Sequence, residues 1–532
     1  MIKAPMATAA AVAATAVWIS FGQPALSQEE ADQRLGSVHF ETSCNETAQR
    51  RFDRGMRYQH SFWYQASREI FEEVFKADPE CGIAYWGIAL SLLNNPHAPP
   101  PAPNLPLGLA AIQKGKAVPA KTQRERDYID TLAVFYTDYD KVPHGARVQA
   151  YLRAMETLAQ KYPGDDEAQI FYAITLNVAA SPNDKSYANQ LKGAAILEPI
   201  FRRQPQHPGV AHYLIHLHDS PALAEKGLDA AKRYAAIAPA APHAQHMPSH
   251  IFTRVGAWNE SIASNSASAR AAKDSKGFDD QLHAMDYMVY AYLQLAQDQK
   301  ARAIVTEMNA VAGVNPNVFV GPYALAVSPA RYAVERGDWK GAAELQAKPS
   351  KFAYADAMTH FARALGAARL GNPEAAKADI AKLAELRETL RAAKDAYWTE
   401  QVDIQWQVAG AWVLYAEGKY DEALKAMSAA ADAEDRTDKH PVTPGVPMPA
   451  RELFGVMLLD RAMAREALAA FEATIKKEPN RFNAVAGAAK AAERLGDKDK
   501  AKDYYQKLTT IASNADTVRP ELAAAREFLA KK

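Results

Sequence analysis

Histidine is concentrated in one part of this chain. Of the 14 histidines in 532 residues, seven lie between positions 207 and 250. His212 and His216 are four positions apart, which places them on one face of a helix. His243, His246 and His250 follow one another at intervals of three and four, so they form a second helical stripe. Two neighbouring helices would then each present imidazole rings along one face.

This pattern is typical of a metal site. Imidazole is the commonest metal-binding side chain, and a pair four residues apart is the spacing with which one helix chelates an ion. The five histidines of the two stripes are therefore candidate ligands for zinc, copper or iron, and spacing alone does not choose among these metals. A third helix carries His283 and Asp286 one turn apart. We expect these two side chains to orient the ligands or to take part in proton transfer.

Two simpler interpretations of the histidines stay open. A groove lined with neutral imidazoles suits a polar peptide or an anion, and repeat proteins commonly act through such a surface. Buried histidines can also serve only as hydrogen-bond partners for the carbonyl groups of neighbouring helices. The remaining isolated histidines are given no role, and they are His60, His97, His144, His360 and His440.

The elements that must position these side chains are helical hairpins repeated along the chain. Ala467 and Phe471 recur 34 residues later as Ala501 and Tyr505, which is the period of the tetratricopeptide repeat. Glycine-containing turns, such as residues 256–258, mark the break between the two helices of a hairpin. The pattern predicts an all-α fold, a right-handed superhelical solenoid of tetratricopeptide-like hairpins whose first helices line a concave face.

The chain divides into five segments. Residues 1–27 combine Lys3, an alanine-rich apolar run and small residues before Gln28, which is typical of a signal peptide cleaved between Ser27 and Gln28. N-terminal helical repeats are expected over residues 28–110, a central solenoid with the histidine cluster over 111–434, a proline-rich loop over 435–449, and C-terminal repeats over 450–532. A second proline cluster at 96–106 is also expected to be an ordered, non-helical connector. The signal predicts a periplasmic or secreted protein.

Export decides how the two cysteines are interpreted. Cys44 and Cys81 are the two cysteines of the chain, and in an oxidising compartment such a pair commonly forms a disulfide. We therefore predict a bond between them. Two buried thiols are the alternative, because the sequence does not fix the distance between the two residues.

Charge and motifs exclude several classes of function. Lysine plus arginine and aspartate plus glutamate number 62 each, so the formal net charge is zero, and we expect no nucleic-acid partner. No segment after the signal is long and apolar enough to span a bilayer, so no membrane span is expected after cleavage. Phosphate-binding loops, dinucleotide fingerprints and serine-hydrolase elbows are absent from the sequence.

Several segments resemble one family of exported bacterial tetratricopeptide-repeat proteins. They are residues 43–44, 60–64 (His-Ser-Phe-Trp-Tyr), 78–81 (Asp-Pro-Glu-Cys), 84–87 (Ala-Tyr-Trp-Gly), 187–191, 212–216 and 242–258. The likeness covers most of the mature chain, and both cysteines and the histidine segments belong to the family pattern. The resemblance implies a helical solenoid outside the cytoplasm. It implies neither a substrate nor a catalytic activity.

Two functions follow from these patterns. The first is an exported interaction scaffold that binds a protein, a peptide or a small ligand on its concave face. The second is a metalloprotein or metal-dependent enzyme whose ion is bound by His212, His216, His243, His246 and His250.

Overall fold

Antiparallel helix pairs follow one another through the computed structural model, which describes residues 34–118, 120–181 and 183–531. Within these ranges the regular structure is helical throughout, without a β-strand. The fold is therefore the all-α helical-repeat solenoid that the sequence predicts. The predicted signal peptide, residues 1–27, and its cleavage site lie outside the described residues.

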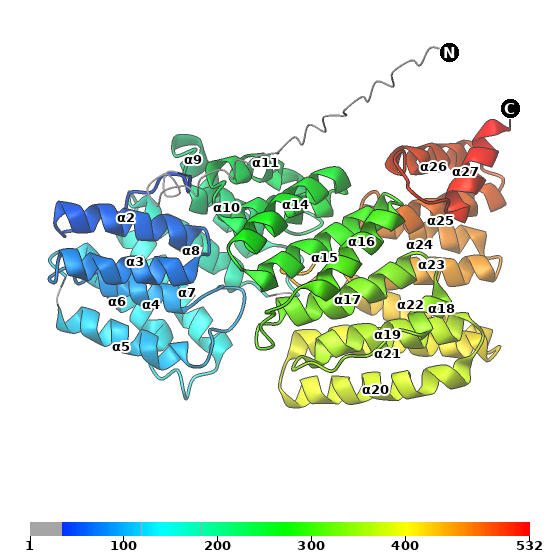
Figure 1. Ribbon diagram of the computed structural model, residues 1–532, viewed down its shortest axis with the longest axis horizontal. Coiled ribbons are helices and arrows are strands. Elements are labelled where there is room, and N and C mark those ends of the chain that lie inside the picture. The colour runs from blue at the N-terminus through cyan, green and yellow to red at the C-terminus, as the bar shows by residue number, and fades with distance from the viewer. Residues whose placement is uncertain (1–33, 119, 182, 532) are drawn as a thin grey trace, which may run out of the picture.

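The helices form three consecutive groups along the molecule (Figure 1). One end contains α2 (Glu46–His60), α3 (Tyr64–Ala77), α4 (Ala84–Leu92), α5 (Asn104–Ala117), α6 (Gln123–Tyr136), α7 (His144–Lys161), α8 (Asp166–Val178) and α9 (Ala188–Arg203). The middle contains α10 (Pro208–His218), the 3-10 helix η1 (Ala224–Gly227), α11 (Leu228–Ile237), α12 (Pro242–His246), α13 (Pro248–Arg254), α14 (Trp258–Asp274), α15 (Phe278–Gln294) and α16 (Asp298–Ala310). The other end contains α17 (Val320–Glu335), α18 (Trp339–Ala343), α19 (Ala353–Arg369), α20 (Pro373–Ala392), α21 (Ala396–Ala416), α22 (Tyr420–Asp435), α23 (Ala450–Asp460), α24 (Ala464–Lys477), α25 (Phe482–Arg494), α26 (Lys498–Ile511) and α27 (Pro520–Ala530).

An aromatic side chain wedged between two glycines holds successive hairpins together. In the C-terminal repeats, a Cβ atom at Gly455 or at Gly487 would lie 2.8 or 2.4 Å from the ring of Phe471. The same arrangement recurs near the N-terminus, where Phe71 packs against Gly55 and Gly87. Any larger residue at these glycines would collide with the ring, so the small and large positions of the repeat pattern are set by close packing.

The array curves until its C-terminal repeats touch the middle. The indole nitrogen of Trp258, at the start of α14, donates to the carbonyl oxygen of Asn480 at 2.9 Å. The side chain of Asn480 donates in return to the carbonyl oxygen of Gly256 at 3.1 Å. Gly256 has a φ of +69°, and a Cβ there would lie 2.2 Å from the carbonyl oxygen of Pro479. These contacts join turns that are more than two hundred residues apart in sequence.

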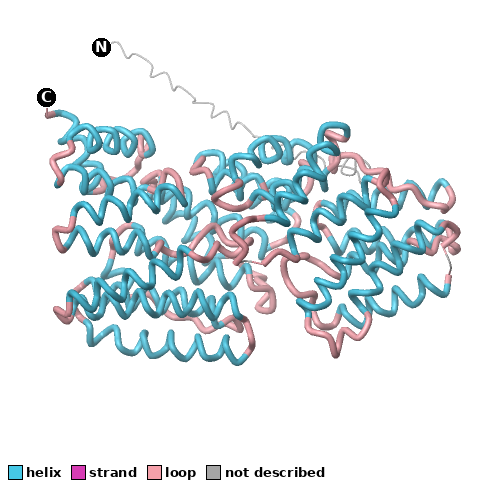
Figure 2. The backbone as a smooth tube through the Cα atoms, turned by 180° about the vertical axis from the view of Figure 1, so that it is seen from behind, coloured by secondary structure: helices cyan, strands magenta, loops and turns pink. Residues whose placement is uncertain are grey.

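The loop between α22 and α23 runs back over the middle helices. Tyr287 on α15 donates to the carbonyl oxygen of Val442 at 3.1 Å, and Arg331 on α17 donates to that of Gly445 at 2.8 Å. Loop segments cross the centre of the molecule between the two end groups (Figure 2). The loop is therefore an ordered cover over α15 and α17, as its prolines predict.

The other proline cluster ends earlier than predicted. Helix α5 begins at Asn104, so Pro106 lies within its first turn. A proline is accepted there because the first amide groups of a helix have no carbonyl partner within the helix.

Proline also divides the second histidine stripe. Helix α12 ends at His246 and α13 begins at Pro248, and each of these short helices has a proline at its start. The helical run is therefore interrupted at Pro248. Because the break changes the direction of the chain between the two helices, His243 and His250 are not obliged to face the same point.

A disulfide fixes the N-terminal end of the array. Cys44, just before α2, is bonded to Cys81, just before α4, with 5.1 Å between their Cα atoms. The apolar core continues from Leu35 to Phe252 without a break near residue 110. The end group and the first middle helices therefore share one core.

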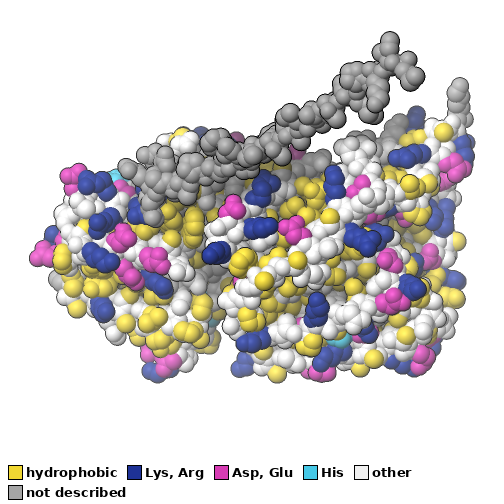
Figure 3. All heavy atoms as spheres, in the orientation of Figure 1, with side chains coloured by type: hydrophobic (Ala, Val, Ile, Leu, Met, Phe, Trp, Pro, Cys, Tyr) yellow, Lys and Arg dark blue, Asp and Glu magenta, His cyan; other side chains and the backbone are white. Residues whose placement is uncertain are grey.

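The surface carries both signs of charge. Figure 3 shows lysine and arginine interspersed with aspartate and glutamate, and very little histidine, on the face that it presents. Among the described helices, none has the length and apolar character needed to cross a membrane.

Candidate metal centre

Six histidines gather in the middle of the molecule as two groups of three. Triad A consists of His212, His216 and His243, and triad B consists of His246, His250 and His283. Within each triad, one ring nitrogen from every residue lies within 4.8 Å of the others. Helices α10 and α12 supply triad A, whereas α12, α13 and α15 supply triad B.

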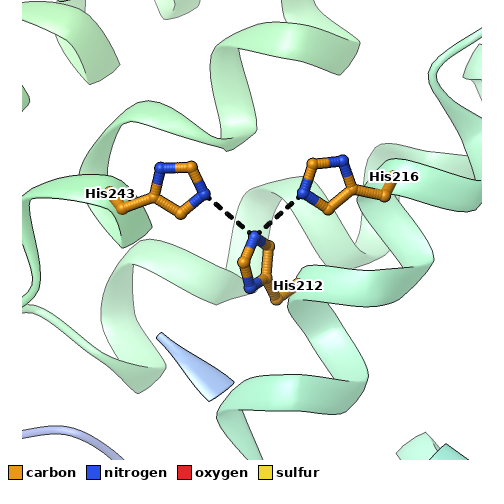
Figure 4. Close-up of side chains that lie close together, drawn as sticks. All are labelled: His212, His216 and His243. Atoms are coloured by element: carbon orange, nitrogen blue, oxygen red, sulfur yellow. Dashed lines mark hydrogen bonds between the residues drawn. The ribbon is translucent and has the colours of Figure 1, made fainter. Parts of the chain in front are cut away.

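Triad A is built around His212. Its Nε2 atom lies 3.1 Å from the Nε2 of His216 and 3.1 Å from that of His243 (Figure 4). The Nδ1 of His212 lies 2.8 Å from the carbonyl oxygen of His60. A carbonyl oxygen only accepts, so Nδ1 carries the proton and Nε2 keeps its lone pair. Three ring nitrogens therefore lie close together, as the ligands of a shared ion do.

In triad B, hydrogen bonds fix the tautomers of two rings. His246 donates from Nδ1 to Oδ1 of Asn265 at 2.6 Å, and the amide group of Asn265 donates to the carbonyl oxygen of Ser261 at 2.8 Å. The second bond identifies Oδ1 as the acceptor. His250 donates from Nδ1 to Oδ2 of Asp219 at 2.9 Å. Both rings therefore have an unprotonated Nε2, and these two atoms lie 3.0 Å apart.

Two nitrogen lone pairs that face each other repel unless a cation lies between them. The hydroxyl of Tyr287 lies 3.4 Å from Nε2 of His250, but it donates its one proton over the shorter distance of 3.1 Å to the carbonyl oxygen of Val442. In a tetrahedral site with metal–nitrogen bonds of about 2.0–2.1 Å, neighbouring nitrogens are about 3.3 Å apart. The separations of 3.0 and 3.1 Å are close to that value. These three contacts therefore have the spacing of ligands that share a metal ion.

The rings are held in the neutral form that binds metal. Burial lowers the pKa of His212 and of His283 to about 3. Burial together with neighbouring imidazoles lowers the pKa of His216, His243 and His246 well below the ordinary value of 6.5. Burial also lowers the pKa of His250, although the carboxylate of Asp219 opposes this change. At neutral pH, a proton is therefore disfavoured as the shared cation.

Asp219 connects triad B to the covering loop. Its carboxylate accepts from His250, from Nε of Arg254 at 2.8 Å and from Nζ of Lys439 at 3.0 Å. Burial alone would raise the pKa of Asp219, but Lys439, Arg254 and His250 hold it well below its ordinary value. The side chain of Asp219 is 4% exposed. Asp219 therefore acts as an anionic acceptor that orients His250. A carboxylate in this position is a common outer partner of a metal-binding histidine.

The third helix contributes differently from the sequence hypothesis. His283 lies within triad B, its ring 4.4 Å from that of His246, so it is a candidate ligand. Asp286 points away to α17, where its carboxylate accepts from Ser328 at 3.1 Å and pairs with Arg331. The buried guanidinium of Arg331 pairs with this carboxylate because the guanidinium would otherwise lack a counter-charge. Asp219 therefore takes the place beside the histidines that the sequence hypothesis gave to Asp286.

The five predicted ligands do not form a single set. His243 joins His212 and His216, while His246 and His250 join His283. The division falls within α12, because His243 faces the two histidines of α10 whereas His246, three residues later, faces His250 on α13 and His283 on α15.

A third cluster, His60, Glu167 and His207, shows what a purely structural arrangement looks like. Both rings direct Nε2 at the carboxylate of Glu167, at 3.0 Å for His60 and 2.9 Å for His207. The Nδ1 of His207 accepts from the amide of Val210, and the Nδ1 of His60 contacts the hydroxyl of Tyr213. Every ring nitrogen here has a complementary partner, so the cluster needs no ion.

This structural cluster nevertheless positions triad A. The carbonyl oxygen of His60 is the acceptor that fixes the tautomer of His212. The next residue but one, Phe62, has a φ of +57° and packs its ring 4.3 Å from that of His212. His60, which the sequence left without a role, is therefore a positioning residue.

A cavity of about 480 Å³ borders the centre on the side of α10. Its lining includes His97, His216, Asp219 and Lys439. The ring of His97 lies 4.4 Å from that of His216, and its buried Nε2 has no hydrogen-bond partner. Burial lowers the pKa of His97 to about 4. A small polar molecule in this cavity would meet triad A and a neutral imidazole that offers a hydrogen bond.

Comparisons with known proteins concern the fold. A tetratricopeptide repeat family model matches residues 484–514. Among solved structures, the chain is similar to one in the crystal structure of the APC/C hetero-tetramer Cut9-Hcn1, with a TM-score of 0.29, 10% identity, and coverage of 91% of this chain and 95% of that chain. No relative was found among curated proteins. Residues 484–514 fall on α25 and α26, so the chain contains a tetratricopeptide repeat within its helical solenoid.

Proposed function

We propose that this protein is an exported metalloprotein whose two histidine triads bind transition-metal ions. The observation that supports it most strongly is the contact between His246 and His250. Both rings donate from Nδ1 to oxygen atoms, and their Nε2 lone pairs face each other at 3.0 Å. A bound metal ion turns this repulsive contact into a pair of ligand bonds.

The proposed chemistry follows from the kind and number of ligands. Three neutral imidazoles leave at least one coordination position on an ion free. A metal ion bound in this way lowers the pKa of a bound water molecule or polarises a substrate oxygen. The cavity beside His216 offers a route for such a molecule. We therefore propose that the protein is a metal-dependent enzyme and not a protein whose metal site is purely structural.

Elemental analysis of the mature protein tests this proposal. The chain is purified from its native compartment without a histidine tag, and its zinc, copper and iron contents are measured. We expect stoichiometric metal in the wild type and a loss in His246→Ala. His360→Ala serves as the matched control, since His360 on α19 contacts Asp379 at 2.6 Å and lies outside both triads. Absence of metal after separate reconstitution with each ion would contradict the proposal.

A second proposal concerns the repeat surface. Helical-repeat proteins bind partners through their extended faces, and the tetratricopeptide match at residues 484–514 supports a protein-interaction role for the C-terminal repeats. We infer that a protein or peptide partner binds the concave face there. Substitutions at exposed positions along α25 should reduce capture of the partner. His246→Ala should leave this capture unchanged. Equal capture by all surface variants would refute this role.

Export is the remaining part of the proposal. It is supported by the signal pattern over residues 1–27 and by the Cys44–Cys81 disulfide, which suits an oxidising compartment. N-terminal sequencing of protein from the periplasm or the medium should begin at Gln28. Recovery of the uncleaved chain from the cytoplasm would overturn it.

A further inference from the structure

The two triads are adjacent and are linked by one short helix. Helix α12 carries His243 of triad A near its start and His246 of triad B at its end, with ring centroids 6.2 Å apart. A second pair, His216 of triad A and His250 of triad B, is also separated by 6.2 Å. Because a metal lies about 2 Å beyond each donor nitrogen, ions bound by the two triads would be near neighbours.

The composition of the ligand set points to one metal. Within the part of the chain that the structure describes, each triad offers three imidazoles and neither a carboxylate nor a thiolate. Calcium, magnesium and manganese prefer oxygen ligands, and non-haem iron(II) sites commonly use two histidines and one carboxylate. Divalent copper stands highest in the affinity order for nitrogen ligands and is well suited by imidazole. Zinc is the closest competitor.

We propose that triads A and B form one dinuclear copper centre, in which the two ions share a bridging ligand of water or hydroxide. This inference rests on the proposed metal-binding function and adds the number of ions, their identity and their coupling. Each ion takes three imidazoles from the protein, and the bridge fills a position that those imidazoles leave open.

The charges around the centre support an anionic bridge. Asp219 is the carboxylate that contacts a ring of triad B, and it is already paired with Arg254 and Lys439. Asp219, Arg254 and Lys439 together therefore carry one net positive charge, so they do not neutralise the charge of the metal. Two divalent ions bound by neutral imidazoles would consequently attract a small anion, and hydroxide is the anion that water supplies.

The surroundings leave one side of the centre for a small molecule. The ring of Phe62 packs over triad A, with centroids 5.7 Å from His216 and 5.2 Å from His243. Tyr287 packs against triad B, 4.8 Å from His246 and 5.3 Å from His250. The cavity lined by His97 reaches His216 at the C-terminal end of α10. A bridging ligand would therefore exchange through this cavity.

Copper stoichiometry and electron paramagnetic resonance test the proposal together. Full-length mature protein is freed of metal, loaded with copper(II), and analysed for copper per chain and for spin per copper. Two neighbouring copper(II) ions joined by a hydroxide couple their unpaired electrons, so most of the signal should be lost. Acid denaturation without oxygen should then restore the full signal, which excludes copper(I) as the cause because copper(I) would stay silent without an oxidant. We expect two copper ions per chain in this experiment.

Two single-triad variants separate the outcomes. His216→Gln should disable triad A and His283→Gln should disable triad B, and both side chains are partly exposed, which limits damage to the core. Each variant should bind one copper ion with a full signal, whereas His360→Gln should behave as the wild type. Two copper ions with full signal in the wild type would overturn the dinuclear centre while leaving metal binding intact. Zinc in place of copper after competitive loading would overturn the identity of the metal, and no bound metal would overturn the proposed function itself.

Discussion

Asn265 provides the sharpest test of how triad B is organised. This buried side chain on α14 accepts the Nδ1 proton of His246 at 2.6 Å and has no place among the ligand atoms. Asn265→Leu keeps the size of the side chain and removes the acceptor. The ring of His246 can then rotate or change tautomer, so its Nε2 is no longer held toward His250. Asn265→Asp replaces the acceptor by a stronger, anionic one.

The expected magnitudes follow from the bond that is changed. Loss of an outer hydrogen bond to a ligating histidine commonly lowers metal affinity 10- to 100-fold, which is about 1.4–2.8 kcal/mol. We expect Asn265→Leu to fall in this range. Asn265→Asp should bind metal at least as tightly as the wild type. Its metal-free form should be less stable, because a carboxylate without a counter-charge is buried.

Thermal unfolding with and without metal separates these effects. At a metal concentration of 100 times the dissociation constant, bound metal stabilises the fold by about 2.7 kcal/mol, and a tenfold weaker site keeps about half of this. The bond from Asn265 to the carbonyl of Ser261 is lost in both states of Asn265→Leu, so it cancels in the difference. Asn189→Leu, which removes a comparable bond to the carbonyl of Leu176 at 3.2 Å, is the control. Unchanged metal stabilisation in Asn265→Leu would refute the proposed role of His246.

Three further predictions concern stability. Replacing Cys44 and Cys81 by serine opens a loop of 37 residues and should lower the free energy of unfolding by about 4 kcal/mol; denaturant titration measures this loss, and an unchanged midpoint would contradict it. Gly487→Ala should cost about 1–3 kcal/mol because its Cβ would lie 2.4 Å from the ring of Phe471; equal stability would show that the ring has room to move. The metal-free protein should lose stability as the pH falls from about 6.5 toward 3, because the unfolded chain binds protons that His212 and His283, with pKa values of about 3, do not. Each of these histidines contributes up to about 1.4 kcal/mol per pH unit in that window, and melting temperatures that do not change between pH 7 and 4.5 in the presence of chelator would contradict this sign.

Local patterns in the sequence predict the repeat architecture because each hairpin contacts mainly its neighbours. The 34-residue recurrence of Ala467 and Phe471 corresponds to α24 and α26, the second helices of the hairpins α23–α24 and α25–α26. Helical spacing likewise predicts that His212 and His216 share a face, and their Nε2 atoms lie 3.1 Å apart. These properties depend on periodicity within one or two helices, which a sequence displays directly.

The grouping of the histidines depends on contacts that periodicity does not describe. His283 and Asp286 are one turn apart on α15, and the position of Arg331 on α17 decides which of them faces the centre. Lys439, one of the groups that hold Asp219 ionised, lies in a loop 220 residues away. Neither fact follows from helical spacing. The one local signal is Asp219 itself, three residues after His216 and following His218 in the same histidine-rich stretch.

Crystals of copper-loaded protein offer the most direct test of the central claim, which is that the facing ring nitrogens of the two triads bind metal. An anomalous difference map at the copper edge should contain one peak about 2 Å from the facing ring nitrogens of triad A and another about 2 Å from those of triad B. Peaks located elsewhere on the chain, or the absence of peaks at both triads with the rings in the positions described, would contradict it.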